Sequence, residues 1–203
     1  MTFLSAFCKI LLLATLLTGC GKDPQVPALR NDDVILAFGD SLTFGTGAAS
    51  NESYPAKLQA MISRKVLAAG VPGEISADGL ARLPQALNEH QPKLLILCHG
   101  GNDFLRKLGD EHTKLNVRAM VKVATDKGIS VVLMATPKPG LIVTTPEFYK
   151  EIASEFAIPF DDVTLKKVLT DNELKSDLVH PNAKGYSQIA EAFATLLKRA
   201  GAV

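Results

Sequence analysis

Residues Val34–Gly47 read VILAFGDSLTFGTG, and this stretch decides the fold class. Its first five residues, VILAF, form a continuous apolar run, which predicts a short strand buried on both faces. Ser41 follows this run by three residues and has glycines close by on both sides. A small serine just past the end of a buried strand is placed to meet a substrate rather than to fill a core.

Segments of the same kind recur along the chain and alternate with helical patterns. We expect strong strands at Leu94–Cys98 and Ile129–Ala135, a weaker strand at Lys65–Ala69 and a short edge strand at Ala157–Phe160. Helices are predicted over residues 51–63, 76–88, 113–127, 146–156 and 183–199. The alternation predicts an α/β fold in which helices cover both faces of a parallel sheet, that is, a three-layer α/β/α sandwich.

Three polar or glycine-rich segments follow three of these strands directly. Ser41 comes after the first strand, Gly73 after the weaker strand and Asn102 after the strand LLILC. Ligands of open parallel sheets bind outside the carboxyl ends of the strands. We therefore expect these three residues to meet at one edge of the sheet.

The motif DLVHPN, residues 177–182, supplies a base for the serine. A serine hydroxyl is a poor nucleophile unless a base takes its proton as it attacks, and histidine suits this role near neutral pH. His180 has Asp177 three residues earlier, a spacing that lets the carboxylate fix the tautomer of the imidazole. Taken alone, the motif also fits a loop that caps the helix beginning after Asn182.

The motif GGND, Gly100–Asp103, supplies a donor for the oxyanion that such an attack creates. Its two glycines allow a close approach of the backbone, and Asn102 carries an amide that cannot titrate. The same four residues also suit a plain turn between a strand and a helix. Further donors are expected from the backbone N–H groups of Ser41 and Gly73.

Several other polar residues near these motifs are assigned no catalytic role. Asp40 and Asp103 are interpreted as hydrogen-bond partners that shape their own loops, and His99 as a residue packed behind the site. The remaining ones are expected on the surface or in structural contacts: His90, His112, Arg82 and Arg106.

Together the motifs resemble those of the SGNH hydrolases, also called GDSL hydrolases, and within them the small bacterial arylesterases, thioesterases and lysophospholipases. FGDSLTFGTG matches the nucleophile block, GGND the third block and DLVHPN the last block, and DGLARLP looks like the thioesterase group. The resemblance implies a flavodoxin-like sandwich with five parallel strands, and a site that uses no metal and no cofactor.

The resemblance also implies a role for each residue of the site. These roles are nucleophile for Ser41, oxyanion donor for Gly73 and Asn102, acid for Asp177 and base for His180. The second block departs from the family pattern NxxxSG, because Ala68 and Pro72 stand at the positions of the asparagine and the serine. The chain lacks the G-x-S-x-G motif and therefore does not resemble an α/β-hydrolase.

The bulk composition bounds the number of domains and the kinds of partner. The chain has 203 residues, enough for one domain of ordinary size, and 47% of them are hydrophobic, enough for a substantial core. Its 22 basic and 21 acidic residues nearly cancel, and no basic run predicts binding to nucleic acid. We expect a monomer whose partner is a small-molecule ester or thioester.

Residues 1–19 resemble a bacterial secretion signal that ends in a lipobox. Lys9 precedes a short apolar run, and the sequence LTGC at residues 17–20 closes it. The run is shorter than the roughly 20 residues that span a bilayer core. The resemblance implies cleavage before Cys20 and a lipid on this cysteine, with a simple secretion signal and a buried first helix as alternatives.

The remaining chain divides into residues 20–31, the lipidated cysteine with a polar tether, and residues 32–203, the hydrolase domain. The lipid implies anchoring to a membrane of the bacterial cell envelope on its periplasmic side, and Gly21 in place of aspartate favours the outer membrane. Cys98 is the one cysteine left in the mature domain. It lies in an apolar run and is expected in the core.

Three functional hypotheses follow from the motifs and the resemblance. The leading one is a serine hydrolase of arylesterase, thioesterase or lysophospholipase type that cleaves carboxylic ester or thioester bonds through an acyl-enzyme on Ser41. The second keeps this chemistry but takes acetylated sugars of the cell envelope as substrates. The third is a non-catalytic, ligand-binding lipoprotein on the same scaffold. The apolar loop Lys138–Thr145 either lines an acyl pocket or packs against the domain.

Overall fold

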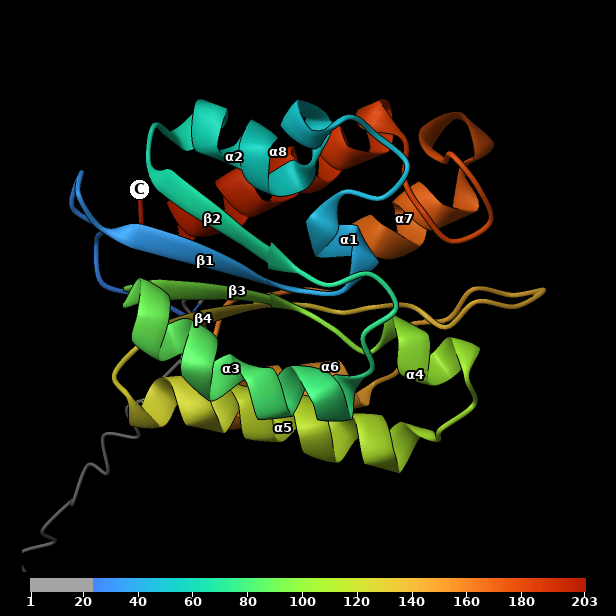
Figure 1. Cartoon of the computed structure of the whole chain (residues 1–203), viewed down its shortest axis with the longest axis horizontal. Helices are drawn as coiled ribbons and strands as arrows, with labels where there is room; N and C mark the ends of the chain where they lie inside the picture. Colours follow the sequence, from blue (N-terminus) through green and yellow to red (C-terminus); the bar gives the residue numbers. More distant parts are fainter. Residues whose placement is uncertain (1–23) are drawn as a thin grey trace, which may run out of the picture.

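Apolar segments of the chain form one parallel sheet in the computed structural model, which describes residues 24–203 (Figure 1). Within this part of the chain the strand order is β2-β1-β3-β4-β5, and neighbouring strands are parallel. The strands are β1 (Val34–Gly39), β2 (Lys65–Gly70), β3 (Leu94–Cys98), β4 (Ser130–Met134) and β5 (Phe160–Asp161). The predicted α/β fold with five parallel strands is therefore confirmed.

The central strands bury both of their faces, which explains why their sequences are apolar without alternation. In β1, Ile35 and Ala37 belong to one core cluster, and Leu36 and Phe38 belong to the other. All four residues are fully shielded from solvent. Because successive side chains of a strand face opposite sides of the sheet, a strand between two helical layers needs an apolar residue at every position.

Two layers of helices cover the two faces of the sheet, as Figure 1 shows. One layer contains α1 (Ser41–Phe44), α2 (Tyr54–Ile62), α7 (Thr164–Thr170) and α8 (Ala183–Arg199). The other layer contains α3 (Ser76–His90), α4 (Gly101–Leu105), α5 (Asp110–Asp126) and α6 (Phe148–Glu155). Short 3-10 turns occur at η1 (Ser50–Glu52) and η2 (Asn172–Leu174). This arrangement is the predicted three-layer sandwich.

Three of the predicted helices begin at other residues than expected, and one of them, α6, begins at Phe148, two residues late. α2 begins at Tyr54, three residues late, because a separate 3-10 turn precedes it and Pro55 suits the first turn of a helix. α5 begins at Asp110, three residues early. Its first turn carries Asp110 and Glu111, whose negative charges the helix dipole favours.

Some elements differ from the prediction in existence or position. The short helices α1, α4 and α7 were not predicted, and α7 forms because Leu165 and Val168 bury themselves against the sheet. The edge strand β5 covers Phe160–Asp161 rather than the segment AIPF. Pro159 lies in that segment and has no N–H to donate to the strand ladder, so pairing begins only after it.

The two ends of the described chain meet at the amino edge of the sheet. The N–H of Val26 donates to the carbonyl of Ala200 over 3.0 Å, and the N–H of Leu29 donates to the carbonyl of Ala202 over 2.8 Å. In Figure 1 this edge lies on the left, and the strand arrows point away from it toward α1 and α4. The chain therefore enters and leaves the domain opposite the edge where the motifs are expected.

The predicted signal segment, residues 1–19, and Cys20 lie outside the residues that the structure describes. Within residues 24–203, no helix combines the length and the apolar character that crossing a membrane requires. From Val26 onward, the predicted tether is held against the domain by the two hydrogen bonds above, and Leu29 is buried.

Gly39 ends β1 at a position where the surrounding atoms leave no room for a side chain. A Cβ there would overlap the carbonyl oxygen of Cys98 and the side chain of Thr43. We predict that Gly39→Ala lowers the free energy of unfolding by roughly 1–3 kcal/mol, the usual cost of overpacking a core. Urea denaturation measures this change.

The control is Gly140→Ala, whose Cβ would meet nothing closer than 3.5 Å. It should change stability by less than about 0.5 kcal/mol, and equal losses in the two variants would contradict the prediction.

Candidate active site

Ser41 is the first residue of α1 and follows β1 almost directly. Asp40 caps this short helix, because its Oδ1 accepts the N–H of Leu42 over 3.0 Å. Gly45 ends the helix in the left-handed conformation, with φ at 94°, which glycine adopts without steric cost. These local features place the hydroxyl of Ser41 at the carboxyl edge of the sheet, where the residue keeps 9% of its surface exposed.

The loop before α8 brings His180 to this serine across 139 positions of the sequence. Nε2 of His180 lies 3.0 Å from Oγ of Ser41, and Nδ1 lies 2.7 Å from Oδ2 of Asp177. Oδ1 of Asp177 accepts the N–H groups of Val179 and His180, each at 2.8 Å. The carboxylate thus keeps the proton on Nδ1 and leaves Nε2 free to accept the proton of the serine hydroxyl.

Hydrogen bonds at its base fix the loop that carries Asp177 and His180. The N–H of Ser176 donates to the carbonyl of His180 over 3.0 Å, and its hydroxyl donates to the carbonyl of Pro181 over 3.2 Å. Asn182 caps α8 by accepting two backbone N–H groups of the first helical turn. The motif DLVHPN therefore both caps a helix and presents an imidazole to the serine.

The carboxyl group of Asp177 is held in its ionised form. Partial burial raises its pKa, but the hydrogen bonds from the imidazole of His180 and from the N–H groups of Val179 and His180 outweigh that effect. The pKa of Asp177 consequently lies below its ordinary value. An ionised carboxylate here stabilises the positive charge that forms on His180 when it accepts a proton.

Gly73 lies on the loop that follows β2, and Asn102 lies in the first turn of α4, which follows β3. Gly73 has φ at 79°, and its carbonyl accepts Nη2 of Arg106 over 2.8 Å. Nδ2 of Asn102 donates to the carbonyl oxygen of Glu74 over 3.0 Å and to Oδ2 of Asp40 over 3.3 Å. The amide of Asn102 is therefore oriented by acceptors on two different loops.

A pocket of about 240 Å³ opens at this edge of the sheet. Ser41, Gly73, Asn102 and His180 line it, and Asp177 lies behind the imidazole. Much of the remaining wall is apolar and is formed by Leu42, Pro72, Leu105, Pro137, Pro139 and Val179. The structure thus brings all five predicted site residues together beside a pocket that suits an apolar ligand.

The apolar loop after β4 contributes to the pocket only at its base. Lys138 pairs with Thr144 in an antiparallel bridge, and the loop forms a narrow ribbon that extends from the domain on the right of Figure 1. Pro139 lines the pocket, whereas Leu141 and Ile142 are exposed. The expectation that this loop lines a pocket therefore holds for its base, whereas the expectation that it packs against the domain is wrong for its tip.

The sequence model of the GDSL-like Lipase/Acylhydrolase family matches residues 37–188, a segment that contains every residue of this site. The chain belongs to this family. The match extends from β1 to the start of α8 and therefore covers almost the whole sandwich.

Proteins related to this GDSL hydrolase are similar over most of their length. The chain is 29% identical over 174 residues to thioesterase 1/protease 1/lysophospholipase L1 of Escherichia coli (strain K12), covering 82% of this chain and 84% of that protein. It is 29% identical over 175 residues to an arylesterase of Vibrio mimicus, covering 81% and 88%. The crystal structure of TesA matches with a TM-score of 0.73 at 26% identity, covering 82% of this chain and 98% of that one. The predicted family, fold and esterase-type enzyme class are confirmed.

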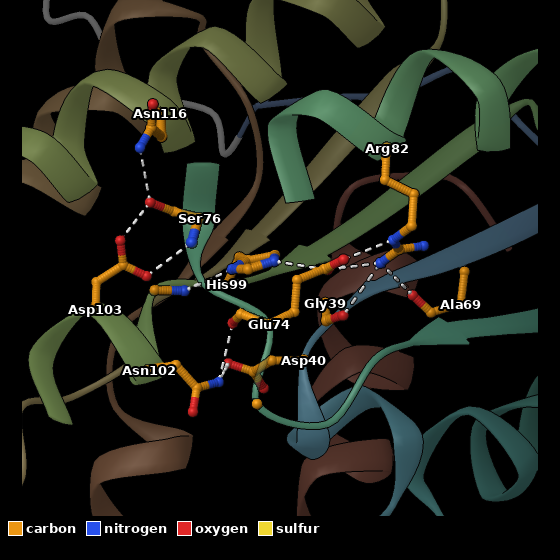
Figure 2. A network of polar contacts seen from close by, with 12 residues as sticks. Gly39, Asp40, Ala69, Glu74, Ser76, Arg82, His99, Asn102, Asp103 and Asn116 are labelled. Atoms are coloured by element: carbon orange, nitrogen blue, oxygen red, sulfur yellow. Dashed lines mark hydrogen bonds and ion pairs between the residues drawn. The ribbon is translucent and has the colours of Figure 1, made fainter. Parts of the chain in front are cut away.

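Behind the pocket of this GDSL hydrolase lies a network of polar residues that the sequence analysis did not identify (Figure 2). The carboxylate of Glu74 accepts Nε and Nη2 of Arg82 over 2.7 Å each, and Nε2 of His99 lies 3.1 Å from its Oε2. The side chain of Glu74 is 6% exposed and that of His99 is fully buried. The sequence feature that could have predicted this network is Arg82 in the motif DGLARLP. An arginine on a helix that packs against a sheet needs a hydrogen-bond acceptor nearby.

Glu74 is ionised within this network. Burial raises its pKa, but the hydrogen bonds from Arg82 and His99 and the positive charge of Arg82 lower it by more than burial raises it. The pKa therefore falls from 4.5 to about 2. The carboxylate therefore keeps its charge, and its bonds to both partners, at any pH near neutrality.

Asp40 and Asp103 act as hydrogen-bond partners, as predicted, but only Asp40 shapes its own loop, because Asp103 bonds to a residue 27 positions away. Asp103 accepts the N–H of Ser76 over 2.8 Å and its hydroxyl over 2.5 Å, which joins α4 to the start of α3. Asp40 caps α1, and burial raises its pKa above the ordinary value. Neither carboxylate approaches the hydroxyl of Ser41 in the way that His180 does.

The remaining reactive side chains show no second site. Cys98 is buried in the core as predicted, and burial raises the pKa of its thiol well above the ordinary value, so that it stays protonated. Among the residues that the structure describes, no group of three or more His, Cys, Asp or Glu side chains is placed to hold a metal ion.

The low pKa of Glu74 makes the stability of the fold depend on pH. Because the pKa is about 2 when folded and near 4.5 when unfolded, ionisation of Glu74 stabilises the fold above pH 4.5. This contribution, roughly 3 kcal/mol, is lost as the pH falls from about 4.5 toward about 2. We predict that Glu74→Gln removes this part of the acid sensitivity, so that the stability gap between wild type and variant narrows as the pH falls.

Urea denaturation at a series of pH values measures this gap. Glu89→Gln, which alters an exposed glutamate on the same helix, is the matched control and should keep the pH dependence of the wild type. Parallel curves for the wild type and Glu74→Gln would contradict the prediction.

Proposed function

We propose that the protein hydrolyses carboxylic ester or thioester bonds through an acyl-enzyme on Ser41. The observation that carries this proposal is the pair of contacts at His180, whose Nε2 lies 3.0 Å from Oγ of Ser41 while its Nδ1 lies 2.7 Å from Asp177. A nucleophile, a base and a group that orients the base, all within hydrogen-bond reach, are the arrangement that a serine hydrolase needs.

In the first half-reaction, Oγ of Ser41 attacks the acyl carbon while Nε2 of His180 takes the hydroxyl proton. Asp177 stabilises the resulting imidazolium. The tetrahedral intermediate then expels the alcohol or thiol, to which His180 returns the proton. In the second half-reaction, the same imidazole takes a proton from water, which attacks the acyl carbon. The bond from this carbon to Oγ of Ser41 then breaks, His180 returns the proton to Oγ, and the acid leaves.

The oxyanion of each intermediate needs donors that are already in place. The backbone N–H groups of Ser41 and Gly73 and the amide of Asn102 fill this role in the proposal. One N–H of Asn102 is held by the carbonyl of Glu74 at 3.0 Å. Nδ2 also donates to Asp40 over a longer distance of 3.3 Å. In the proposal, this weaker hydrogen bond is replaced by one to the oxyanion.

The substrate class follows from the pocket and from the relatives. The pocket wall near the serine carries apolar groups such as Leu42, Leu105 and Val179, which can pack against an acyl chain. The relatives are named thioesterase, lysophospholipase and arylesterase. Both observations support esters or thioesters of apolar acyl groups as substrates of this chain.

We predict that a fluorophosphonate probe labels Ser41 in the native protein, because the activated hydroxyl attacks phosphorus as it attacks an acyl carbon. Mass spectrometry of proteolytic peptides locates the label. Ser41→Ala should abolish the labelling, whereas Ser50→Ala, which alters an exposed serine, should leave it unchanged. A native protein that does not react with the probe would refute the proposed nucleophile.

A panel of aryl esters, acyl thioesters, lysophospholipids and acetylated sugars then identifies the substrate class. Hydrolysis of one of the first three supports the proposal as stated. Release of acetate from acetylated wall polymer, without hydrolysis of the other substrates, would favour the deacetylase hypothesis and retain the same catalytic residues.

We also propose that a lipid on Cys20 anchors the mature protein to the periplasmic side of the bacterial envelope, with the outer membrane favoured. The lipobox-like sequence LTGC at residues 17–20 supports this. Val26 is held at the amino edge of the sheet, so the connection from Cys20 spans at most about 20 Å. Since a domain of this size is roughly 40 Å across, this anchor would hold the pocket away from the anchoring leaflet.

Lipidation is tested by metabolic labelling with palmitate and by fractionation of membranes in a bacterial host. We predict that the full chain incorporates palmitate and fractionates with the membrane, and that Cys20→Ala does neither because it has no thiol to acylate. Cys8→Ala is the matched control, since this cysteine lies within the predicted signal segment, and it should behave like the wild type. Incorporation of palmitate by Cys20→Ala would contradict the predicted anchor.

A further inference from the structure

The loop that carries Gly73 and the segment that carries Asn102, at the start of α4, follow strands on opposite sides of β1, so the sheet ladder does not join them. Side chains make the connection instead, as Figure 2 shows. Glu74, next to Gly73, meets His99 from the end of β3, with Nε2 of His99 at 3.1 Å from Oε2 of Glu74. The carbonyl of Glu74 accepts the amide of Asn102 over 3.0 Å. Two hydrogen bonds through one residue therefore link the two segments.

His99 is fixed in a single tautomer. The N–H of Gly100 donates to Nδ1 over 3.0 Å, so Nδ1 carries no proton and Nε2–H donates to Glu74. Gly79 on α3 makes room for the ring, because a Cβ there would overlap Nε2. The imidazole thus has one end on the turn that begins GGND and the other end on the loop of Gly73.

Arg82 fixes Glu74 relative to the sheet. Besides its two bonds to the carboxylate, its Nη2 donates to the carbonyl of Ala69 over 3.1 Å, and its guanidinium lies 4.0 Å from the centre of the Phe38 ring. Compared with a well-packed apolar pair, an ion pair of this kind adds little net stability, because desolvation offsets the attraction, although ionisation of Glu74 stabilises the fold relative to its protonated form. The consequence of this pair is therefore geometric: it sets the position of residue 74 and of the carbonyl that holds Asn102.

We propose that Glu74, His99 and Arg82 are positioning residues that hold the N–H of Gly73 and the amide of Asn102 in register for the oxyanion. This inference rests on the proposed function, in which these two groups and the N–H of Ser41 are the donors. None of the three positioning side chains lines the pocket, so each acts through another residue. The expected signature is a loss of kcat with little change in KM.

A double-mutant cycle between Glu74 and Asn102 tests the inference. Asn102→Ala should lower kcat by about 10²–10³-fold, as loss of one oxyanion donor does. Glu74→Ala should lower kcat by about 10²-fold, the size expected when a catalytic group is misplaced, and Glu74→Gln should lose less because its amide still forms hydrogen bonds. In the Asn102→Ala background, Glu74→Ala should cost clearly less than in the wild-type background, since one of the two groups that it positions is absent.

Equal losses from Glu74→Ala in the two backgrounds would overturn the inference, as would an unchanged kcat or a change in KM alone. Glu89→Gln, an exposed glutamate on α3, is the matched control and should keep the kcat of the wild type. Thermal melting followed by circular dichroism verifies that each variant is folded at the assay temperature. If Glu74→Ala does not fold, the same cycle is run with Glu74→Gln.

Two substitutions separate the hydrogen bonds of His99. The asparagine amide reaches the position of Nδ1, so His99→Asn keeps the contact to Gly100, and glutamine reaches the position of Nε2, so His99→Gln keeps the contact to Glu74. If the link to Glu74 positions the donors, His99→Asn should lower kcat more than His99→Gln. An equal loss, or the reverse order, would show that this link does not position them.

Ser41→Ala separates failure of this inference from failure of the proposed function. Full activity of Ser41→Ala would reject the proposed acyl-enzyme itself, and the inference with it. An inactive Ser41→Ala together with equal losses in the double-mutant cycle would reject only the positioning role.

Discussion

The parallel register of β2, β1 and β3 is the constraint on which the site depends. Gly39 at the end of β1 pairs with Gly70 of β2 and with Cys98 of β3, so that the three strands end on one line. The segments that leave this line carry the serine and the proposed oxyanion donors Gly73 and Asn102. Glycine ends β1 and β2 because α1 packs on these ends, and a Cβ on Gly70 would overlap the backbone of that helix. The sheet therefore sets the spacing of the site before any side chain contributes.

Negative charge behind an oxyanion site must be compensated, because repulsion between like charges is strong where water is excluded. Glu74 and Asp40 both lie close to the amide of Asn102. Arg82 balances the charge of Glu74 at 2.7 Å, and burial raises the pKa of Asp40, which favours its neutral form. The charge of Glu74 is thus compensated by a neighbouring cation, and burial acts against the charge of Asp40.

The central strands were predictable from sequence because burial on both faces imposes a local pattern, an apolar residue at every position. The motifs that carry the serine and the imidazole are equally local. α7 was missed because its short segment gains its stability from burying Leu165 and Val168, which depends on the rest of the fold. The contact between Glu74 and His99 joins residues 25 positions apart across an intervening strand, and no local pattern encodes it.

The second motif illustrates how a departure from a family pattern is accommodated. Pro72 stands where the family pattern has serine, and proline fixes φ and offers no N–H to the loop. The loop is held by other groups: the N–H of Glu74 closes a turn on the carbonyl of Val71 at 3.1 Å, and Arg106 holds the carbonyl of Gly73 at 2.8 Å. The side chain of Glu74 adds a third attachment, through Arg82. Because Glu74, Arg82 and Arg106 lie outside the NxxxSG positions, the geometry of this loop depends on residues that a comparison of motifs does not include.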